Sequence, residues 1–502
     1  MKLTQDQVPA FEEGLPINKL RRTFQEALVV AHRMRIPYIW IDSLCIIQSG
    51  DDGMDWEREC ATMADVYSNS ICNISADWGT EENGLFFQRD VCETWCGFEM
   101  RLKKGASEKR SYWQEWQSCY LLRGYKWIDD FLRSPLNHRG WVTQERLLAP
   151  RVLHFTPQQV SWECTRMLRS EKWPAQNFRS SSLRRLAREV DACWEERELM
   201  ERLKLHDPGK SWNHNNLVDW WHDRVSHYTA CSFTKESDKL VAIAGIAKKL
   251  QPLVKDQYVA GLWAKSLPRA LAWRRLREFD RTTRIVDQKS VYCAPTFSWA
   301  AADGYVEVPS SAVARRFNSL VSTEFISYRE RNSSTEAGEQ PTMDDEILTK
   351  DVLGLPKSLE VEIRARGILR SCRLIAPEET ENAWGQREIS LSIDLQRGSI
   401  CHRMDLDCDR AAEWEGVVNH CLYYYAPICW ECSIDHFPTL IIERGLLMRS
   451  VDASMGRFER VGYVSTMDAG KDFQGIKQLG NEKYLPAWSY DEVMKEHTFY
   501  IV

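Results

Sequence analysis

One carboxylate, Asp42, interrupts the nearly continuous apolar run of residues 38–47. A charged group in an apolar strand costs free energy unless it has a partner, so Asp42 is a candidate ligand-binding residue. It could contact a ligand or orient Arg139. It could also cap the following turn by accepting backbone N–H bonds, with Gln48 acting in the same way. The sequence leaves both roles open and favours the capping role.

Cysteine and histidine residues form no recognisable metal site or nucleophile. Cys45 is interpreted as a small buried hydrophobe, because no histidine stands near it in the sequence. Cys429 and Cys432 form a lone C-x-x-C pair, which lacks the paired spacing of structural zinc sites. No Walker A or Gly-x-Gly-x-x-Gly fingerprint is present. We therefore expect no metal, and no nucleotide-driven motor or Rossmann dehydrogenase.

The elements around Asp42 follow the order of an α/β domain. Apolar spacing and run length predict helices over 17–35, 54–68 and 139–148, and strands over 38–47, 70–76, 152–155 and 160–164. The last two strands are expected to form a hairpin. A run as dense as residues 38–47 suits a strand of a parallel sheet that is covered on both faces. Asp42 would then lie near the carboxyl end of its strand, where ligands bind in open α/β sheets.

The pattern changes twice after residue 165. Residues 1–165 are assigned to the α/β domain and residues 166–326 are mainly helical, with helices expected over 181–205, 238–250 and 260–276. A polar, turn-rich stretch over 327–348 predicts a linker or loop. Residues 349–502 are expected to be β-rich, with strands over 359–368, 389–395, 421–428, 439–448 and 457–464. A length of 502 residues also favours two or three domains.

Composition excludes several classes of protein. Hydrophobic residues make up 43% and charged residues 27%, as in soluble globular proteins. The net charge of −6 provides no basic footprint, so nucleic acid is not expected as a partner. There is no apolar run of about 18 residues and no signal-peptide pattern, so we expect no membrane span. The 16 cysteines are interpreted as reduced thiols of a cytoplasmic or nuclear protein.

Two blocks resemble signature blocks of the fungal heterokaryon incompatibility (HET) domain. They are residues 39–48 (IWIDSLCIIQ) and 139–148 (RGWVTQERLL), and further matches include Leu15-Pro16, residues 55–59, 84–86 and 150–155. A weaker resemblance continues in blocks between residues 238 and 300. Members of the family usually begin with an Ala-Leu-Ser-Tyr-x-Trp-Gly-like block. Only 14 residues precede Leu15, and they contain no such block, so we expect the first strand of the domain to be missing.

The resemblance also implies a fold and a chemistry. The HET domain is thought to be related to the Toll/interleukin-receptor (TIR) fold, a flavodoxin-like α/β domain with a parallel sheet. Some TIR domains hydrolyse NAD with a glutamate in a Trp-x-x-x-Glu pattern, and Trp141 and Glu145 have this spacing. A helix places the two residues one turn apart on one face.

By this resemblance Glu145 is the catalytic candidate. Its carboxylate could stabilise an oxocarbenium-like state as nicotinamide leaves, and Arg139, Trp141 and Gln144 are motif residues beside it. In the alternative interpretation, Glu145 pairs with Arg139 or Arg146 and Trp141 belongs to the core.

Three functions follow. The first is a non-self recognition protein of fungal innate immunity, whose HET domain triggers programmed cell death or growth arrest when activated by proximity or oligomerisation. The second is an NAD-hydrolysing enzyme, for which NAD is a substrate and no other cofactor is expected. The third is a non-enzymatic interaction module. The expected partners are other proteins, through self-association or through an allelic non-self protein.

Overall fold

A computed structural model describes most of the first 171 residues and the central parts of the remaining chain. The described residues are 2–80, 83–89, 98–103, 116–121, 133–164, 168–171, 213–276, 294–302, 304–309, 317–319, 322–330, 359–381, 387–394, 403–406, 423–433, 440–469, 487, 489–491 and 496–502. The chain divides into two compact units, residues 1–208 and 209–502. Each unit is described by itself.

The first unit contains the three helices predicted from the sequence and several short helical turns that were not predicted. They are η1 (Gln5–Gln7), α1 (Val8–Glu13), η2 (Ile17–Lys19), α2 (Arg22–Arg33), α3 (Asp42–Cys45), α4 (Met54–Asn69), η3 (Leu136–His138) and α6 (Gly140–Leu148). The helices predicted over 17–35, 54–68 and 139–148 are therefore confirmed as α2, α4 and α6. The α2 helix starts later than expected, because residues 17–19 form a separate 3-10 turn and Arg21 has an extended backbone.

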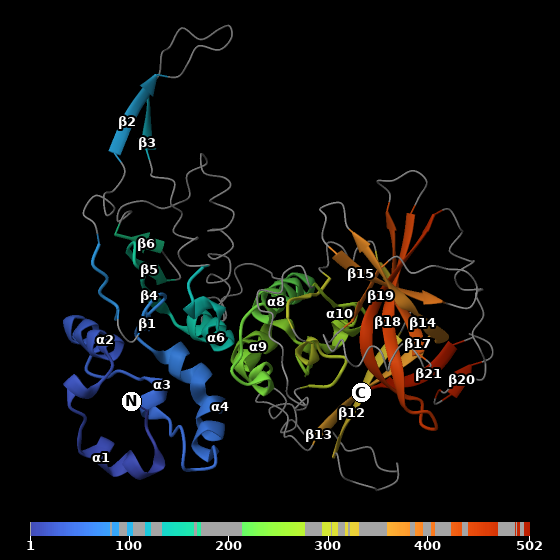
Figure 1. Cartoon of the computed structure of the whole chain (residues 1–502), viewed down its shortest axis with the longest axis horizontal. Coiled ribbons are helices and arrows are strands. Elements are labelled where there is room, and N and C mark those ends of the chain that lie inside the picture. Colours follow the sequence, from blue (N-terminus) through green and yellow to red (C-terminus); the bar gives the residue numbers. More distant parts are fainter. Residues whose placement is uncertain are drawn as a thin grey trace. The chain divides into compact units, whose positions relative to one another are not determined.

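The sheet of the first unit has four strands in the order β1–β4–β5–β6, as labelled in Figure 1. The strands are β1 (Asn73–Ser75), β4 (Arg151–Phe155), β5 (Val160–Cys164) and β6 (Leu168–Ser170). The first pair is parallel and the other two pairs are antiparallel. The predicted β4–β5 hairpin is confirmed, whereas the sheet is mixed rather than wholly parallel. A separate antiparallel pair joins β2 (Phe98–Lys103) to β3 (Trp116–Leu121).

The two faces of the four-stranded sheet differ in chemistry. One face is apolar and packs against α2 through a cluster that includes Ala27, Val30, Ile74, Leu153 and Val160. Side chains alternate along a strand, so His154 and Glu163 lie on the other face. That face meets α6, because Arg146 of α6 forms an ion pair with Glu163. The sheet thus has an apolar core on one side and a polar layer on the other.

The strand predicted over residues 38–47 is absent from the structure. Residues 38–41 carry no regular structure, and α3 makes one helical turn from Asp42 to Cys45. The Asp42 carboxylate accepts the Ser43 backbone N–H at 2.6 Å, a local bond that favours a turn over an extended strand. Because this turn lies at the surface, Cys45 is exposed rather than buried as expected.

The second unit begins with helices around a tryptophan-rich core. Its helices include α8 (His214–Thr229), α9 (Val241–Val254) and α10 (Leu267–Ala270), and its short strands include β7 (Tyr258–Val259), β8 (Leu262–Trp263), β9 (Arg274–Arg275) and β10 (Val306–Glu307). The helix predicted over 238–250 is confirmed by α9. The helix predicted over 181–205 lies outside the described residues.

The single helix predicted over residues 260–276 is wrong, since β8, α10 and β9 divide this range. Gly261 has a φ of +93°, where a helix cannot continue, and its carbonyl accepts N–H bonds from Trp221 and Trp299 at 2.9 Å each. Tertiary anchoring by two buried indoles therefore overrides the local helical pattern.

The rest of the second unit is an 11-stranded sheet with the main order β12–β13–β21–β19–β18–β17–β14–β15. Its strands are β11 (Phe317–Ser319), β12 (Ser322–Glu330), β13 (Leu359–Gly367), β14 (Arg370–Glu381), β15 (Arg387–Asp394), β16 (Arg403–Leu406), β17 (Tyr423–Ser433), β18 (Leu440–Asp452), β19 (Arg457–Ala469), β20 (Ser489–Asp491) and β21 (Glu496–Ile501). The strands predicted after residue 349 are confirmed. The β12 strand extends into residues 327–330, where a loop was expected. Within the described residues, no helix is both long and apolar enough to cross a bilayer.

Candidate functional site

Aromatic contacts between α4 and α6 bring the candidate residues together. Trp56 of α4 meets Trp141 of α6 edge to face, with ring centroids 6.2 Å apart. Tyr67, three turns further along α4, packs against Trp40 with centroids 5.8 Å apart. Such edge-to-face pairs add roughly 1 kcal/mol each beyond burial. They fix the two helices so that the Tyr67 hydroxyl reaches Glu145.

Glu145 is the centre of a cluster of charged and polar side chains. Burial raises the pKa of its carboxyl to about 7, with the Arg139 guanidinium and the Tyr67 hydrogen bond opposing this rise and the Asp42 carboxylate adding to it. The side chain is half-buried, so solvent screens part of these interactions. A carboxyl with a pKa near 7 populates both protonation states at neutral pH, which suits a general acid or base.

Tyr67 acts as a stable hydrogen-bond donor in this cluster. Burial, together with the charges of Glu145 and Asp42, holds the pKa of its hydroxyl well above 10. The phenol therefore stays neutral and donates to the Glu145 carboxylate at neutral pH. Tyr67 was not among the predicted site residues, and its role at Glu145 depends on the packing of α4 against α6.

The structure brings three of the six predicted site residues into one electrostatic cluster. Asp42 and Arg139 are exposed, at the start of α3 and at the N-cap of α6, and both influence Glu145. Asp42 also accepts the Ser43 N–H, but the N-cap of α3 is Ile41 and no side chain caps this helix, so the local bond of Asp42 is not a helix cap. Together with Tyr67, these residues form what we call the Glu145 cluster (Asp42, Tyr67, Arg139 and Glu145).

The other three predicted residues have positions that suit packing and turns. Gln48 is exposed, and its amide donates to the Ile46 carbonyl at 3.1 Å, within the turn that follows α3. Gln144 is buried on α6, and Trp141 is half-buried against Trp56. The alternative pairing of Glu145 with Arg146 is not formed, because the Arg146 guanidinium binds Glu163 instead.

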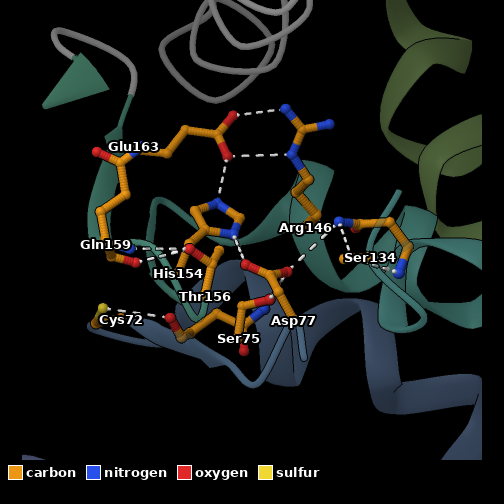
Figure 2. A network of polar contacts seen from close by, with 11 residues as sticks. Cys72, Ser75, Asp77, Ser134, Arg146, His154, Thr156, Gln159 and Glu163 are labelled. Carbon is orange, nitrogen blue, oxygen red and sulfur yellow. Dashed lines mark hydrogen bonds and ion pairs between the residues drawn. The ribbon is translucent and has the colours of Figure 1, made fainter. Parts of the chain in front are cut away.

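A second group of polar residues, most of them buried, lies on the sheet face that meets α6 (Figure 2). His154 is central to it. One ring nitrogen lies 2.9 Å from Asp77 and the other lies 2.8 Å from Glu163. Glu163 in turn accepts two bonds from the Arg146 guanidinium, at 3.1 and 2.9 Å. We call Asp77, His154, Glu163 and Arg146 the buried network.

The buried network depends on the register of the β4–β5 hairpin. Thr156 and Gln159 close the hairpin turn through side-chain and backbone hydrogen bonds (Figure 2). This register sets His154 opposite Ser161 and therefore diagonal to Glu163. The parallel pairing of β1 with β4 sets Ser75 beside His154, and the Ser75 hydroxyl donates to Asp77 at 2.9 Å.

The charges of the buried network compensate one another. Burial by itself disfavours the imidazolium, but the carboxylates of Asp77 and Glu163 outweigh it and raise the pKa of His154 above 6.5. A carboxylate accepts hydrogen bonds and has none to donate, so both ring nitrogens of His154 donate. Two carboxylates, one imidazolium and one guanidinium then sum to zero charge, which makes their burial tolerable.

Sequence reasoning did not single out the buried network. A usable signal was present, because His154 and Glu163 are polar residues at alternate positions of two strands predicted to pair. Within the described residues, no group of three or more cysteine, histidine or carboxylate side chains is arranged to hold a metal ion.

The fold and the site define a mixed α/β domain. Its half-buried carboxylate, Glu145, lies on α6, the helix that directly precedes β4 in the chain. Residues 3–145 match the family model described as heterokaryon incompatibility protein (HET). Residues 3–145 therefore form a HET domain, and this matched region contains all four residues of the Glu145 cluster. No curated protein and no solved structure matches the chain.

Proposed function

We propose that this chain is a fungal non-self recognition protein whose HET domain causes programmed cell death or growth arrest, and that it acts through Glu145. The family match over residues 3–145 supports the biological role. The observation that carries the site assignment is the half-buried Glu145 carboxyl, whose pKa is raised to about 7. Perturbed carboxyls of this kind are concentrated at functional sites. Activation would come from contact with another protein, either a second copy or an allelic partner.

The test is expression in a filamentous fungus at matched protein levels. We expect the wild-type chain to arrest growth and Glu145→Gln to lose most of this effect, since the amide has nearly the same shape and cannot exchange a proton. Glu13→Gln, an exposed position on α1, serves as the matched control and should behave as wild type. Full arrest by Glu145→Gln would instead favour a HET domain that works only by docking partners.

A second candidate function is hydrolysis of NAD in a TIR-like site. It is favoured by the position of Glu145 one turn after Trp141 on α6, with an exposed guanidinium, Arg139, beside the carboxyl. In the ionised form Glu145 would stabilise positive charge on the ribose as the glycosidic bond breaks and nicotinamide leaves with the bonding electrons. Water would then add to the ribose carbon and pass its proton to the carboxylate, which leaves ADP-ribose.

Nicotinamide release from NAD distinguishes this candidate. The full chain is incubated with NAD, both alone and fused to an inducible dimerisation domain, and compared with Glu145→Gln and Glu13→Gln. We expect release that dimerisation increases and that Glu145→Gln lowers by at least about 100-fold. If the dimerised wild-type chain releases no more nicotinamide than Glu145→Gln, the NAD reaction is excluded and the first proposal stands or falls on the growth assay.

A further inference from the structure

Glu145 and Arg146 are consecutive residues of α6, and their side chains enter two different groups. An α-helix turns by about 100° per residue, so neighbours leave the helix in different directions. Glu145 faces the Tyr67 side of α6, whereas Arg146 reaches Glu163 on β5. Any rotation of α6 about its axis therefore moves both side chains together.

The orientation of α6 depends on tertiary contacts. The helix has only nine residues, and its N-cap, Arg139, makes no side-chain capping bond. A helix this short is marginal in isolation and takes its position from its packing. The two bonds from the Arg146 guanidinium to Glu163 form a bidentate pair, a geometry that restricts direction as well as distance.

Glu163 is itself held in place by the rest of the buried network. Its Oε2 atom accepts from both Arg146 and His154, and His154 is anchored at its other nitrogen by Asp77. The side chains of all four residues are at most 14% exposed. Water therefore cannot easily replace a lost partner, and a change at His154 is transmitted to Arg146 through Glu163.

Asp77 also reaches the other end of α6. Its backbone carbonyl accepts the Leu136 N–H at 3.4 Å, and its carboxylate accepts the Asn137 amide at 3.4 Å. Both donors belong to η3, the turn that leads directly into α6. The buried network thus contacts the approach to α6 through Asp77 and the second turn of α6 through Arg146.

We propose that the buried network is a positioning device for Glu145, in which His154 acts through Glu163 and Arg146 to hold α6 in the rotation that sets the Glu145 carboxyl against Tyr67. His154 is a positioning residue, since it is buried on the sheet and acts on α6 through its bond to Glu163 and the bonds of Glu163 to Arg146. A rotation of about 20° at a radius of about 6 Å would move the carboxyl by roughly 2 Å. This displacement is enough to break its hydrogen bond to Tyr67.

The test measures the ionisation of Glu145 in the full chain. Carbon-13 labelling of glutamate carboxyls gives a titration curve by NMR, and the Glu145 signal is the one lost in Glu145→Gln. The positioning variants are His154→Gln, which cannot be protonated, and Arg146→Lys, which keeps the charge and loses the bidentate geometry. The matched control is Arg58→Lys, because the Arg58 side chain is 72% exposed in its ion pair with Asp55.

We expect the Glu145 signal to titrate near pH 7 in the wild type and in Arg58→Lys. In both positioning variants its pKa should fall by one unit or more, because turning the carboxyl toward solvent removes the burial that is the largest cause of the rise, and this outweighs the loss of the Tyr67 hydrogen bond. One unit is a tenfold change in the ratio of ionised to protonated carboxyl at a given pH. Arg146→Lys keeps the test decisive if His154→Gln does not fold.

A Glu145 pKa that stays within about 0.2 units of the wild-type value in folded Arg146→Lys would overturn the positioning role and leave the network a purely structural feature. The functional meaning of this inference rests on the proposed function, but the two can fail separately. If the pKa moves while Glu145→Gln still arrests growth, the positioning holds and the proposed role of Glu145 fails. If Glu145→Gln loses arrest while the pKa does not move, the reverse follows.

Discussion

The Glu145 cluster and the buried network lie on two sides of one short helix and treat charge in opposite ways. In the buried network every charged side chain has a partner of opposite sign within 3.1 Å. In the Glu145 cluster Asp42 and Arg139 are exposed, and the half-buried carboxyl between them is poorly compensated. Full pairing therefore accompanies deep burial, whereas incomplete pairing accompanies a perturbed pKa.

This difference separates structural from chemical roles. A buried charge with a partner contributes geometry, and it is costly to disturb because the remaining partner is left unpaired. A carboxyl that is disfavoured in its ionised form is cheap to neutralise and ready to exchange a proton. The same substitution, glutamate to glutamine, should therefore have opposite effects on stability at Glu163 and at Glu145.

The largest effect is expected for Glu163→Gln. It leaves Arg146 without an ionic partner and weakens the bond to His154, so it should destabilise the first unit by about 3–5 kcal/mol. Hydrogen exchange of backbone amides in β4 and β5 measures the loss as faster local opening. The matched control is Glu59→Gln, whose ion pair with Arg58 at 3.3 Å is solvent-exposed and should contribute less than about 1 kcal/mol. Equal protection in the two variants would mean that the buried network does not stabilise the unit.

The next largest effect is expected for Glu145→Gln, which should stabilise the first unit above neutral pH, whereas Glu163→Gln destabilises it. The pKa of this group is raised in the folded state from 4.5 to about 7, so the folded chain holds the proton more tightly, and stability falls as pH rises through this window. The fall is roughly 3 kcal/mol at most, and partial exposure reduces it. Glu145→Gln should be more stable than the wild type at pH 8 and equally stable at pH 4. Urea unfolding at the two pH values measures the difference in unfolding free energy. The relevant transition is that of the first unit, which is identified as the one that Glu163→Gln shifts.

The ionisation of His154 makes stability depend on pH in a second range, and this separates the contribution of the buried network from that of Glu145. The raised pKa of its imidazolium contributes stability that is fully present below pH 6.5 and is lost as pH rises through the folded-state pKa. Glu145→Gln should therefore abolish the loss of stability between pH 4.5 and 7 and retain the loss at higher pH. A variant that is flat over the whole range would assign both windows to Glu145.

The sequence predicts the elements better than it predicts their pairing. Apolar periodicity locates α2, α4 and α6, and the β4–β5 hairpin follows from two short runs around a turn. The prediction from apolar pattern is wrong at residues 38–47, where the Asp42 carboxylate accepts the next backbone N–H and the chain makes a turn. It fails again after Gly261, where the carbonyl is fixed by two distant indoles.

The candidate site could be predicted only in part from the sequence, because local patterns do not show which elements pack together. The spacing of Trp141 and Glu145 depends on one helix, so the sequence contains it. The sequence left open whether Asp42 orients Arg139 and favoured a turn-capping role for it, so it did not predict that Asp42, Arg139 and Glu145 form one cluster. Tyr67 and the buried network depend on which helix packs on which, and on a hairpin register that sets His154 diagonal to Glu163. Such contacts join distant positions, 77 residues apart for His154 and Asp77, and local patterns carry no information about them.

The smallest effect distinguishes the sources of the Glu145 shift. The Tyr67 hydroxyl donates to the ionised carboxyl and so opposes the rise in its pKa, while burial and Asp42 increase it. Tyr67→Phe should therefore move the Glu145 pKa above 7, by less than about one unit, with little change in packing against Trp40. NMR titration of the labelled carboxyl measures the shift, and Tyr38→Phe, at a tyrosine that is 87% exposed, serves as the control.

A fall in the Glu145 pKa in Tyr67→Phe would mean that the phenol shields the carboxyl from solvent more than it stabilises its charge. In that case burial by Tyr67, rather than its hydrogen bond, would be its main contribution. Packing against α4 would then set the environment of the Glu145 carboxyl. In the buried network, by contrast, hydrogen bonds between charged side chains hold the residues in place.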